Sequence, residues 1–179
     1  TIPAGVQTIG SYAFSGCRNA KFNPALPETL TAIGDYAFQN CANLYAVTLP
    51  ASLQTIGDHA FEASNVQEAV LPAGLKTIGA YAFRKCSNIT RVALSDGLTT
   101  LGEGAFQQCE ALVTADLMNP MEITSIPRYA FDGCSGLRNV YLPFFIEAVG
   151  DYAFRGCASL RQIQFVAPTK TIGAYAFSG

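Results

Sequence analysis

Eight copies of the dipeptide Ala-Phe recur along this chain at intervals of 22 to 25 residues. The phenylalanines of these copies are Phe14, Phe38, Phe61, Phe83, Phe106, Phe131, Phe154 and Phe177. A unit of this length cannot bury its own apolar face, so it must stack on further copies of itself. The spacing therefore predicts a solenoid in which residues 1–179 form one domain of seven to eight repeats.

Each copy follows the pattern Leu-Pro-x-x-Leu-x-x-Ile-Gly-x-Tyr-Ala-Phe-x-x-Cys-x-x-Leu-x-x-Val-x. The alternation at residues 47–49 is typical of a half-buried strand, and Pro50 would end it. Such strands, stacked in register, predict a parallel sheet with about 4.8 Å between repeats. The stretch from glycine to cysteine predicts a short helical turn, because acids such as Asp35 and Asp58 follow the glycine, as at a helix start. Pro127, which replaces one glycine, indicates that this position needs no left-handed backbone.

The pattern resembles the BspA-like, or treponemal-type, leucine-rich repeats over the whole chain. The resemblance rests on Cys41, Leu44, Val47, Leu49, Pro50, Leu53, Ile56, Gly57, Ala60 and Phe61 and on their copies in the other repeats. It implies a right-handed α/β-type coil with a short-stranded parallel sheet on one face and short helical or irregular turns on the other. It also implies a bacterial surface or secreted protein, hence an extracellular or cell-surface location and adhesion to host proteins.

Composition narrows the possible partners. Charged residues make up 13% of the chain and its net charge is −2, so it has no basic patch for nucleic acid. No run approaches the 18 or so apolar residues that a membrane helix needs. Neither end carries a signal peptide, and the chain begins and stops within a repeat. We therefore expect a piece of a longer chain, whose open coil ends are able to self-associate end to end.

No set of residues indicates catalysis, a metal or a cofactor. One repeat position carries Cys17, Cys41, Cys86, Cys109, Cys134 and Cys157. We interpret them as a ladder of buried free thiols, with disulfides between neighbouring coils as the alternative. His59 stands where other copies have tyrosine, so we interpret it as a tyrosine substitute on the outer turn. The repeated aspartates fit helix starts better than calcium, because each coil supplies one carboxylate without a ligand-rich loop.

The exposed side of the predicted strands is the first candidate binding surface. Its variable positions include Glu68, Arg91, Asp116, Asn139, Tyr141, Gln162 and Gln164. This strip is mixed and mostly neutral, which suits a protein or peptide better than a small molecule. A solvated face without a ligand is the alternative.

A local irregularity marks a second candidate surface. The longest interval between phenylalanines has its extra residues at 118–122, and the next copy carries aromatic residues where others have small or polar ones. Stacking would bring together Met118, Met121, Phe144 and Phe145, with Tyr141 close by. Either these side chains form an exposed apolar patch of the kind found at interfaces, or the longer loop covers the phenylalanines.

The sequence thus predicts a non-enzymatic protein-binding module of a surface-displayed or secreted protein. Its expected partner is a protein on a host cell, in host matrix or on another microbe. The alternative is a structural spacer that projects another domain and has no ligand of its own.

Overall fold

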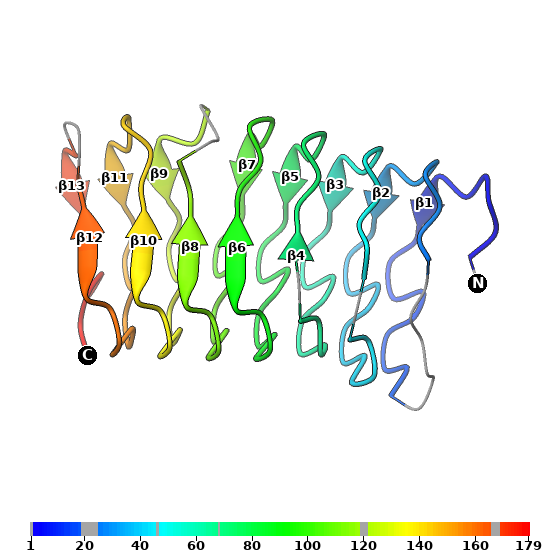
Figure 1. Cartoon of the computed structure of the whole chain (residues 1–179), viewed down its shortest axis with the longest axis horizontal. Coiled ribbons are helices and arrows are strands. Elements are labelled where there is room, and N and C mark those ends of the chain that lie inside the picture. The colour runs from blue at the N-terminus through cyan, green and yellow to red at the C-terminus, as the bar shows by residue number, and fades with distance from the viewer. Residues whose placement is uncertain (1, 19–24, 46, 68, 119–121, 166–168) are drawn as a thin grey trace.

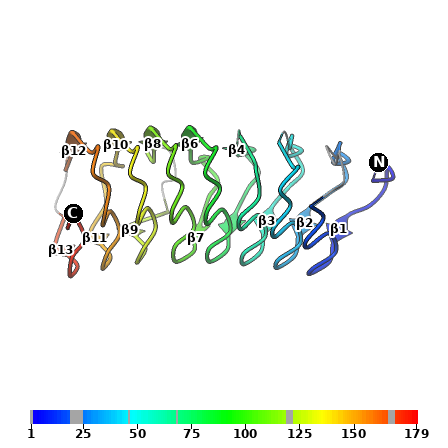
Figure 2. The same cartoon turned by 90° about the horizontal axis from the view of Figure 1, so that it is seen from below.

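The computed structural model consists of coils stacked along one axis, with short strands along two opposite edges (Figures 1 and 2). It describes residues 2–18, 25–45, 47–67, 69–118, 122–165 and 169–179. The front edge in Figure 1 carries β4 (Ala69–Val70), β6 (Arg91–Ala93), β8 (Thr114–Asp116), β10 (Asn139–Tyr141) and β12 (Gln162–Gln164). The rear edge carries β1 (Thr8–Ile9), β2 (Ala32–Ile33), β3 (Thr55–Ile56), β5 (Thr77–Ile78), β7 (Thr100–Leu101), β9 (Ser125–Ile126), β11 (Ala148–Val149) and β13 (Thr171–Ile172).

All paired strands are parallel and advance by one coil. The front sheet runs in the order β12-β10-β8-β6-β4, with Arg91 beside Thr114 and Asn139 beside Gln162. The rear strands form two separate sheets, β1-β2-β3-β5-β7 and β13-β11-β9, so that β7 and β9 are not paired. The parallel solenoid that the repeat predicted is confirmed, and the break in its rear edge is an addition that the repeat did not predict.

Alternating burial and an early turn keep the front strands short. In β6, Arg91 is exposed, Val92 is fully buried and Ala93 is half-buried. The strand predicted at residues 47–49 is wrong, because the structure forms no strand there. The turn that follows these residues is present, with the N–H of Leu53 donating to the carbonyl of Pro50 at 3.0 Å. Proline suits this position because its missing N–H cannot continue the ladder.

The phenylalanines of the repeat form a continuous stack through the interior. Neighbouring rings lie nearly parallel from Phe14 to Phe177, with centroids 5.2 to 5.6 Å apart. The rings between these two ends are at most 1% exposed. Each ring thus packs on copies of itself above and below, which is how a thin coil buries a large apolar side chain.

The stretch predicted as a helical turn is not helical, because two residues in each copy have a left-handed backbone. In the second copy these are Tyr36, with φ 56°, and Asn40, with φ 57°. The N–H groups of Tyr36, Phe38 and Asn40 donate to carbonyls of the next coil at 2.7 to 2.8 Å. Bonds between coils thereby satisfy backbone groups that a helix would pair within itself. The helical prediction was wrong because it considered only bonds within one coil.

Close approach of the coils explains the glycine of the repeat. Gly34 and Gly57 have no positive φ, as Pro127 had indicated. A side-chain carbon added at Gly57 would lie only 2.7 Å from the nitrogen of Asp35 in the preceding coil. The acids that follow the glycine also link coils, since Asp35 Oδ1 accepts the N–H of Asp58 at 2.9 Å. Their predicted role at a helix start was therefore wrong.

The cysteines line the interior as free thiols, which confirms the prediction. Five are buried, and Cys17 is half-buried. Each buried thiol donates to a phenylalanine carbonyl of the preceding repeat, as from Cys86 to Phe61 at 3.0 Å and from Cys109 to Phe83 at 3.2 Å. Burial raises the pKa of Cys86 to about 12, so this thiol stays protonated at neutral pH.

Candidate functional site

The front sheet brings most of the predicted strip residues into two rows. Arg91, Thr114, Asn139 and Gln162 follow one another in one row, and Ala93, Asp116, Tyr141 and Gln164 form the next. Arg91 and Asp116 form an ion pair across two strands, with Nη2 and Oδ2 3.6 Å apart. Since the Arg91 side chain is 67% exposed, water screens this pair and leaves the guanidinium accessible. Glu68 lies outside the described residues, and so does the side chain of Gln164.

The corner after the front strands exposes three large apolar side chains. Met118, Tyr141 and Phe144, which we term the apolar corner, are 47%, 48% and 63% exposed. They come from consecutive coils, because the N–H of Leu117 donates to the carbonyl of Tyr141 at 2.9 Å.

The alternative in which the longer loop buries both phenylalanines is wrong for Phe144, because that side chain is exposed. Phe145 is half-buried. The backbone turns after Pro143, where the N–H of Ile146 donates to its carbonyl at 3.4 Å, and this turn contains both phenylalanines. Met121 lies outside the described residues. Phe144 thus joins Met118 and Tyr141 in the apolar corner, whereas Phe145 is only partly accessible.

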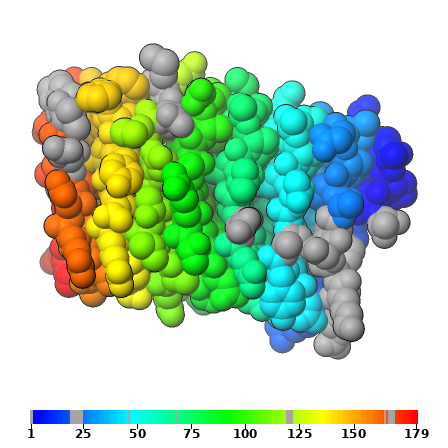
Figure 3. Space-filling model, viewed as in Figure 1, coloured from blue at the N-terminus to red at the C-terminus, as the bar shows by residue number. Residues whose placement is uncertain are grey.

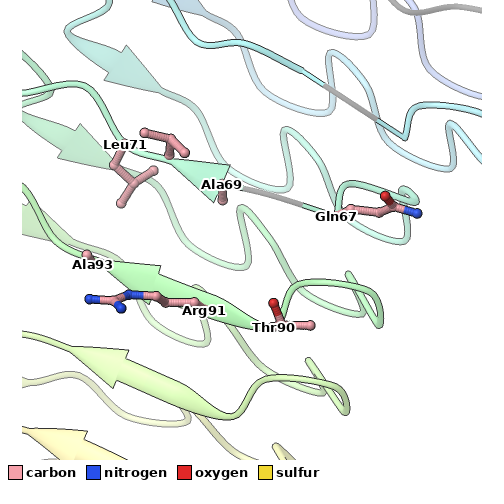
Figure 4. Close-up of a pocket in the computed structure, with 7 residues that line it drawn as sticks. Gln67, Ala69, Leu71, Thr90, Arg91 and Ala93 are labelled. Carbon is pink, nitrogen blue, oxygen red and sulfur yellow. The ribbon is translucent and has the colours of Figure 1, made fainter.

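Two hollows flank Val70 on the front face, which the sequence did not suggest. One has a volume of about 460 Å³ and lies between β4 and β6 (Figure 4), and the other, of about 450 Å³, lies between β4 and residues 45 and 47–49. Gln67, Thr90 and Arg91 line the first hollow near the strand starts, while Ala93 lies further along. Val70 lines both hollows and is itself 73% exposed. The irregularity of the sequence at this place is the interval of 22 residues between Phe61 and Phe83, which is the shortest of the chain.

Seen from the front, the coils form a ridged surface with one ridge for each repeat (Figure 3). The hollows lie between such ridges in the first half of the front face, and the apolar corner lies in the second half. This face therefore offers shallow relief along an extended, regular surface, which is suited to contact with another macromolecule.

The turns that contain the Ala-Phe dipeptides, which we term the turn edge, carry a column of stacked tyrosines. Tyr12, Tyr36, His59 and Tyr81 stack with centroids 4.6 to 5.1 Å apart, which confirms that His59 substitutes for tyrosine. A second stack contains Tyr129, Tyr152 and Tyr175. The two stacks are separated by Gly104, which stands where other copies have the ring. Burial and a hydrogen bond to Glu103 raise the pKa of Tyr81 to about 12.

A polar ladder runs beside this tyrosine column, and sequence reasoning missed it. In two groups of three coils, the residue after the phenylalanine pairs with its counterpart in the neighbouring coil, as Gln39 and Arg84 do with Glu62 from either side. Further along, Gln107 and Arg155 both donate to Asp132, which is 4% exposed. Arg155 makes two bonds of 2.7 and 2.8 Å to the two carboxylate oxygens. These pairings are internal to the edge, so they stabilise the stack and leave few charges for a ligand.

Neither catalysis nor metal binding gains support from the geometry. The parts of the chain that the structure describes contain no group of three or more histidine, cysteine or acidic residues able to hold a metal ion. Nδ1 of His59 lies 2.8 Å from Oε2 of Glu62, so the only histidine is engaged in the polar ladder. The same described ranges hold no helix long and apolar enough to cross a membrane.

Comparison with known proteins identifies the class of this scaffold. The sequence matches the family model described as the BspA type leucine rich repeat region, in six copies over residues 1–113 and 54–179. The chain therefore belongs to the BspA-type leucine-rich repeat family, as its pattern had suggested. This family is defined by a repeat scaffold rather than by an enzyme active site. No curated protein matches the chain.

Solved structures show the same architecture. A leucine-rich repeat protein from Bacteroides ovatus is 32% identical with a TM-score of 0.83, over 94% of this chain and 43% of that one. The T. pallidum leucine rich repeat protein is 30% identical with a TM-score of 0.80, over 88% of this chain and 72% of that one. A leucine rich cell surface protein from Faecalibacterium prausnitzii shares the fold at 23% identity and a TM-score of 0.58, over 96% and 52%. The chain thus spans less than half of the Bacteroides ovatus protein.

Proposed function

We propose that this chain is a non-enzymatic protein-binding module of a cell-surface or secreted protein, and that its apolar corner anchors the partner. The observation that carries the proposal is the joint exposure of Met118, Tyr141 and Phe144 on consecutive coils. Aromatic and methionine side chains are enriched in interface cores, where a few of them supply most of the binding energy.

The scaffold behind the corner favours this role. Hydrogen bonds between coils order the backbone on both sides of Tyr141, through Asp116 on one strand and Gln164 on the other. A preordered backbone reduces the entropy that binding must overcome. The polar rows with Arg91, Asn139 and Gln162 then surround the anchor, as the polar rim of an interface does.

The partner we infer is a folded protein on a host cell, in host matrix or on another microbe. The front face has shallow hollows and a mixed polar strip, which fit a protein surface better than a small metabolite. Membership of the BspA-type family and the likeness to a cell surface protein support an extracellular location.

A capture experiment with matched variants tests the proposal. The biotinylated chain is incubated with solubilised surface proteins of host cells and of bacteria, and retained proteins are identified by mass spectrometry. We expect the double variant Tyr141→Ala, Phe144→Ala to lose the partner while keeping the circular dichroism of the wild type. Tyr175→Ala is the control, because it removes a tyrosine that is 65% exposed on the turn edge.

The possible results separate the two candidate functions. A partner retained by the wild type and by Tyr175→Ala but not by the double variant supports binding through the apolar corner. Equal retention by all three proteins would place the contact elsewhere on the coil. Retention of no protein would favour the structural spacer.

A further inference from the structure

The junction between β7 and β9 lacks the backbone bonds that join the other coils. At each of the other junctions, a glycine N–H donates to the carbonyl of the preceding coil at 2.7 to 2.8 Å. These donors are Gly34, Gly57, Gly79, Gly102, Gly150 and Gly173. The remaining junction has Pro127 at this position, which has no N–H, so the carbonyl of Leu101 loses its donor.

The first bond of the rear ladder is also missing at this junction. The N–H of Thr99 donates backward to Lys76 at 2.9 Å, and that of Glu147 donates to Thr124 at 2.7 Å. Within the described ranges, no N–H donates in the same way to the carbonyl of Thr99. The edges of β7 and β9 that face each other therefore present unpaired backbone groups, which is the arrangement that accepts an added strand.

A groove occupies the space between these two edges. Figures 1 and 2 show β7 and β9 further apart along the axis than any other neighbouring rear strands. The groove measures about 180 Å³ and is lined by residues 99–101 on one side and by residues 122–125 and Pro127 on the other. The same coils stay joined at the front, where Arg91 lies beside Thr114, and in the core, where Phe106 stacks on Phe131 at 5.6 Å. The coils thus separate only at the rear edge.

The groove walls select for a polar, basic occupant. Thr99, Thr100, Thr124 and Ser125 are among the residues that line it, and Glu122 adds an exposed carboxylate. No described residue forms an ion pair or side-chain hydrogen bond with Glu122, whereas Glu147 on the following coil is paired with Lys170 at 2.8 Å. A lysine or arginine side chain entering the groove would complete the same kind of pair.

We propose that the groove between β7 and β9 binds an extended segment of the partner protein as an inserted rear strand, with a basic side chain against Glu122. The proposal rests on the proposed function, because the segment belongs to the protein that contacts the apolar corner. N–H groups of the segment would donate to the carbonyls of Thr99 and Leu101, and its carbonyls would accept from Thr124 and Ser125. Met118 precedes Glu122 by four residues, so corner and groove are close enough for one partner.

A peptide copied from the chain itself provides the probe. Residues 73–80, Ala-Gly-Leu-Lys-Thr-Ile-Gly-Ala, include β5, which pairs with β3 and β7 on its two sides. In the rear ladder, Lys76 occupies the same repeat position as Thr99 and Thr124. The basic side chain of an inserted strand is expected beside these two residues. The labelled peptide is titrated into the full chain by fluorescence anisotropy, and amide hydrogen exchange is measured with and without it.

The expected result is saturable binding with slowed exchange at Thr124 and Ser125. The same peptide with a methyl group on the nitrogen of Gly79 should not bind, because this N–H corresponds to the glycine donor that is missing at the carbonyl of Leu101. Glu122→Lys should weaken binding by about tenfold, the effect of losing one charged contact. Glu110→Lys is the control, since it makes the same charge change at an exposed acid outside the groove.

Other results would overturn the inference. Unchanged exchange at Thr124 and Ser125, protection confined to β1 or β13, or equal binding of the methylated peptide would each exclude an inserted strand. These outcomes are independent of the capture experiment. If Phe144 is needed for capture but the peptide leaves the groove unprotected, the proposed function stands and the inserted strand is wrong. If the peptide protects the groove but no partner is captured, the strand-binding groove stands and the proposed function fails.

Discussion

Two aromatic columns run along the solenoid, and only the interior one is complete. The phenylalanine stack continues without interruption from Phe14 to Phe177, while the tyrosine column on the turn edge is broken at Gly104. A missing ring in the interior would leave a cavity with no atoms to fill it, whereas a missing ring at the surface is replaced by water or by a neighbour. The difference shows where packing restricts the repeat and where it leaves the sequence free.

The neighbour that fills the surface gap is Tyr81. A side-chain carbon added at Gly104 would lie 2.5 Å from Cδ1 of Tyr81, so this ring covers the glycine. Its hydroxyl donates to Oε1 of Glu103 at 2.6 Å, which holds the ring toward the next coil. The outer column thus adapts by moving one side chain, an adjustment that the close-packed interior does not permit.

Removing one ring from each column should give the largest difference in the free energy of unfolding between the two columns. Phe83→Ala is expected to reduce the free energy of unfolding by about 3 to 5 kcal/mol, because the ring is 1% exposed and leaves a cavity. Tyr175→Ala, at 65% exposure, is expected to cost less than about 1 kcal/mol. Urea unfolding followed by circular dichroism measures both values. Similar losses for the two variants would contradict the distinction between the columns.

The polar ladder beside the outer column provides the next largest effect. Asp132→Ala is expected to cost about 2 kcal/mol, because it removes three hydrogen bonds from Gln107 and Arg155 at a buried position. Glu147→Ala removes a carboxylate whose pair with Lys170 is exposed, so we expect less than about 0.5 kcal/mol. Both are measured by urea unfolding. An Asp132→Ala variant as stable as Glu147→Ala would show that the ladder does not stabilise the stack.

The interior thiols predict a loss of stability at alkaline pH. Burial raises the pKa of Cys86 from 9.0 to about 12, so above pH 9 the unfolded chain releases a proton that the folded chain keeps. The contribution of this thiol is complete below pH 9 and falls as the pH rises toward 12, by about 1.4 kcal/mol at pH 10. Cys86→Ser should therefore lose less stability than the wild type between pH 8 and pH 10. Equal losses in urea unfolding at these two pH values would contradict the burial of an un-ionised thiol.

Completing the outer column should have little effect on stability. Gly104 has φ 58°, and its tyrosine counterparts have the same left-handed backbone, so the main chain accepts a tyrosine there. Tyr81 must move aside, and the new ring would stack between the two halves of the column. We expect Gly104→Tyr to change the free energy of unfolding by less than about 1 kcal/mol in either direction. A loss above about 2 kcal/mol would show that the outer column is as restricted as the interior.

The features that the sequence predicted are those in which one residue type recurs. The phenylalanine stack and the thiol ladder follow directly from repeated Phe and Cys. The polar ladder escaped notice because its position carries Gln39, Glu62 and Arg84 in turn, whose complementarity emerges only when coils are stacked. Reading each repeat position as a column would have revealed this alternation.

Other features depend on hydrogen bonds between coils or on the orientation of a turn, which the repeat pattern does not specify. The left-handed residues Tyr36 and Asn40 take the place of a helix because their own N–H groups donate to the next coil, which no single repeat contains. The exposure of Phe144 depends on how the turn after Pro143 is oriented, not on the residue types in it. Pro127 correctly indicated that the glycine position needs no positive φ. The same proline also lacks an N–H, and this was the clearer sign that the rear edge opens between β7 and β9.

The backbone bonds of the tyrosine turn and the bond of the rear glycine run in opposite directions along the chain. At the turn edge, Tyr36 donates forward to Asp58, and at the rear edge, Gly57 donates backward to Ile33. The two sides of a coil that face its neighbours therefore differ, and each matches the opposite side of a coil that keeps the glycine. Away from the junction between β7 and β9, a whole unit can be duplicated or deleted without creating a new kind of junction, which changes the length of the solenoid by about 4.8 Å. The distance that such a protein spans can thus evolve separately from the surface that it presents.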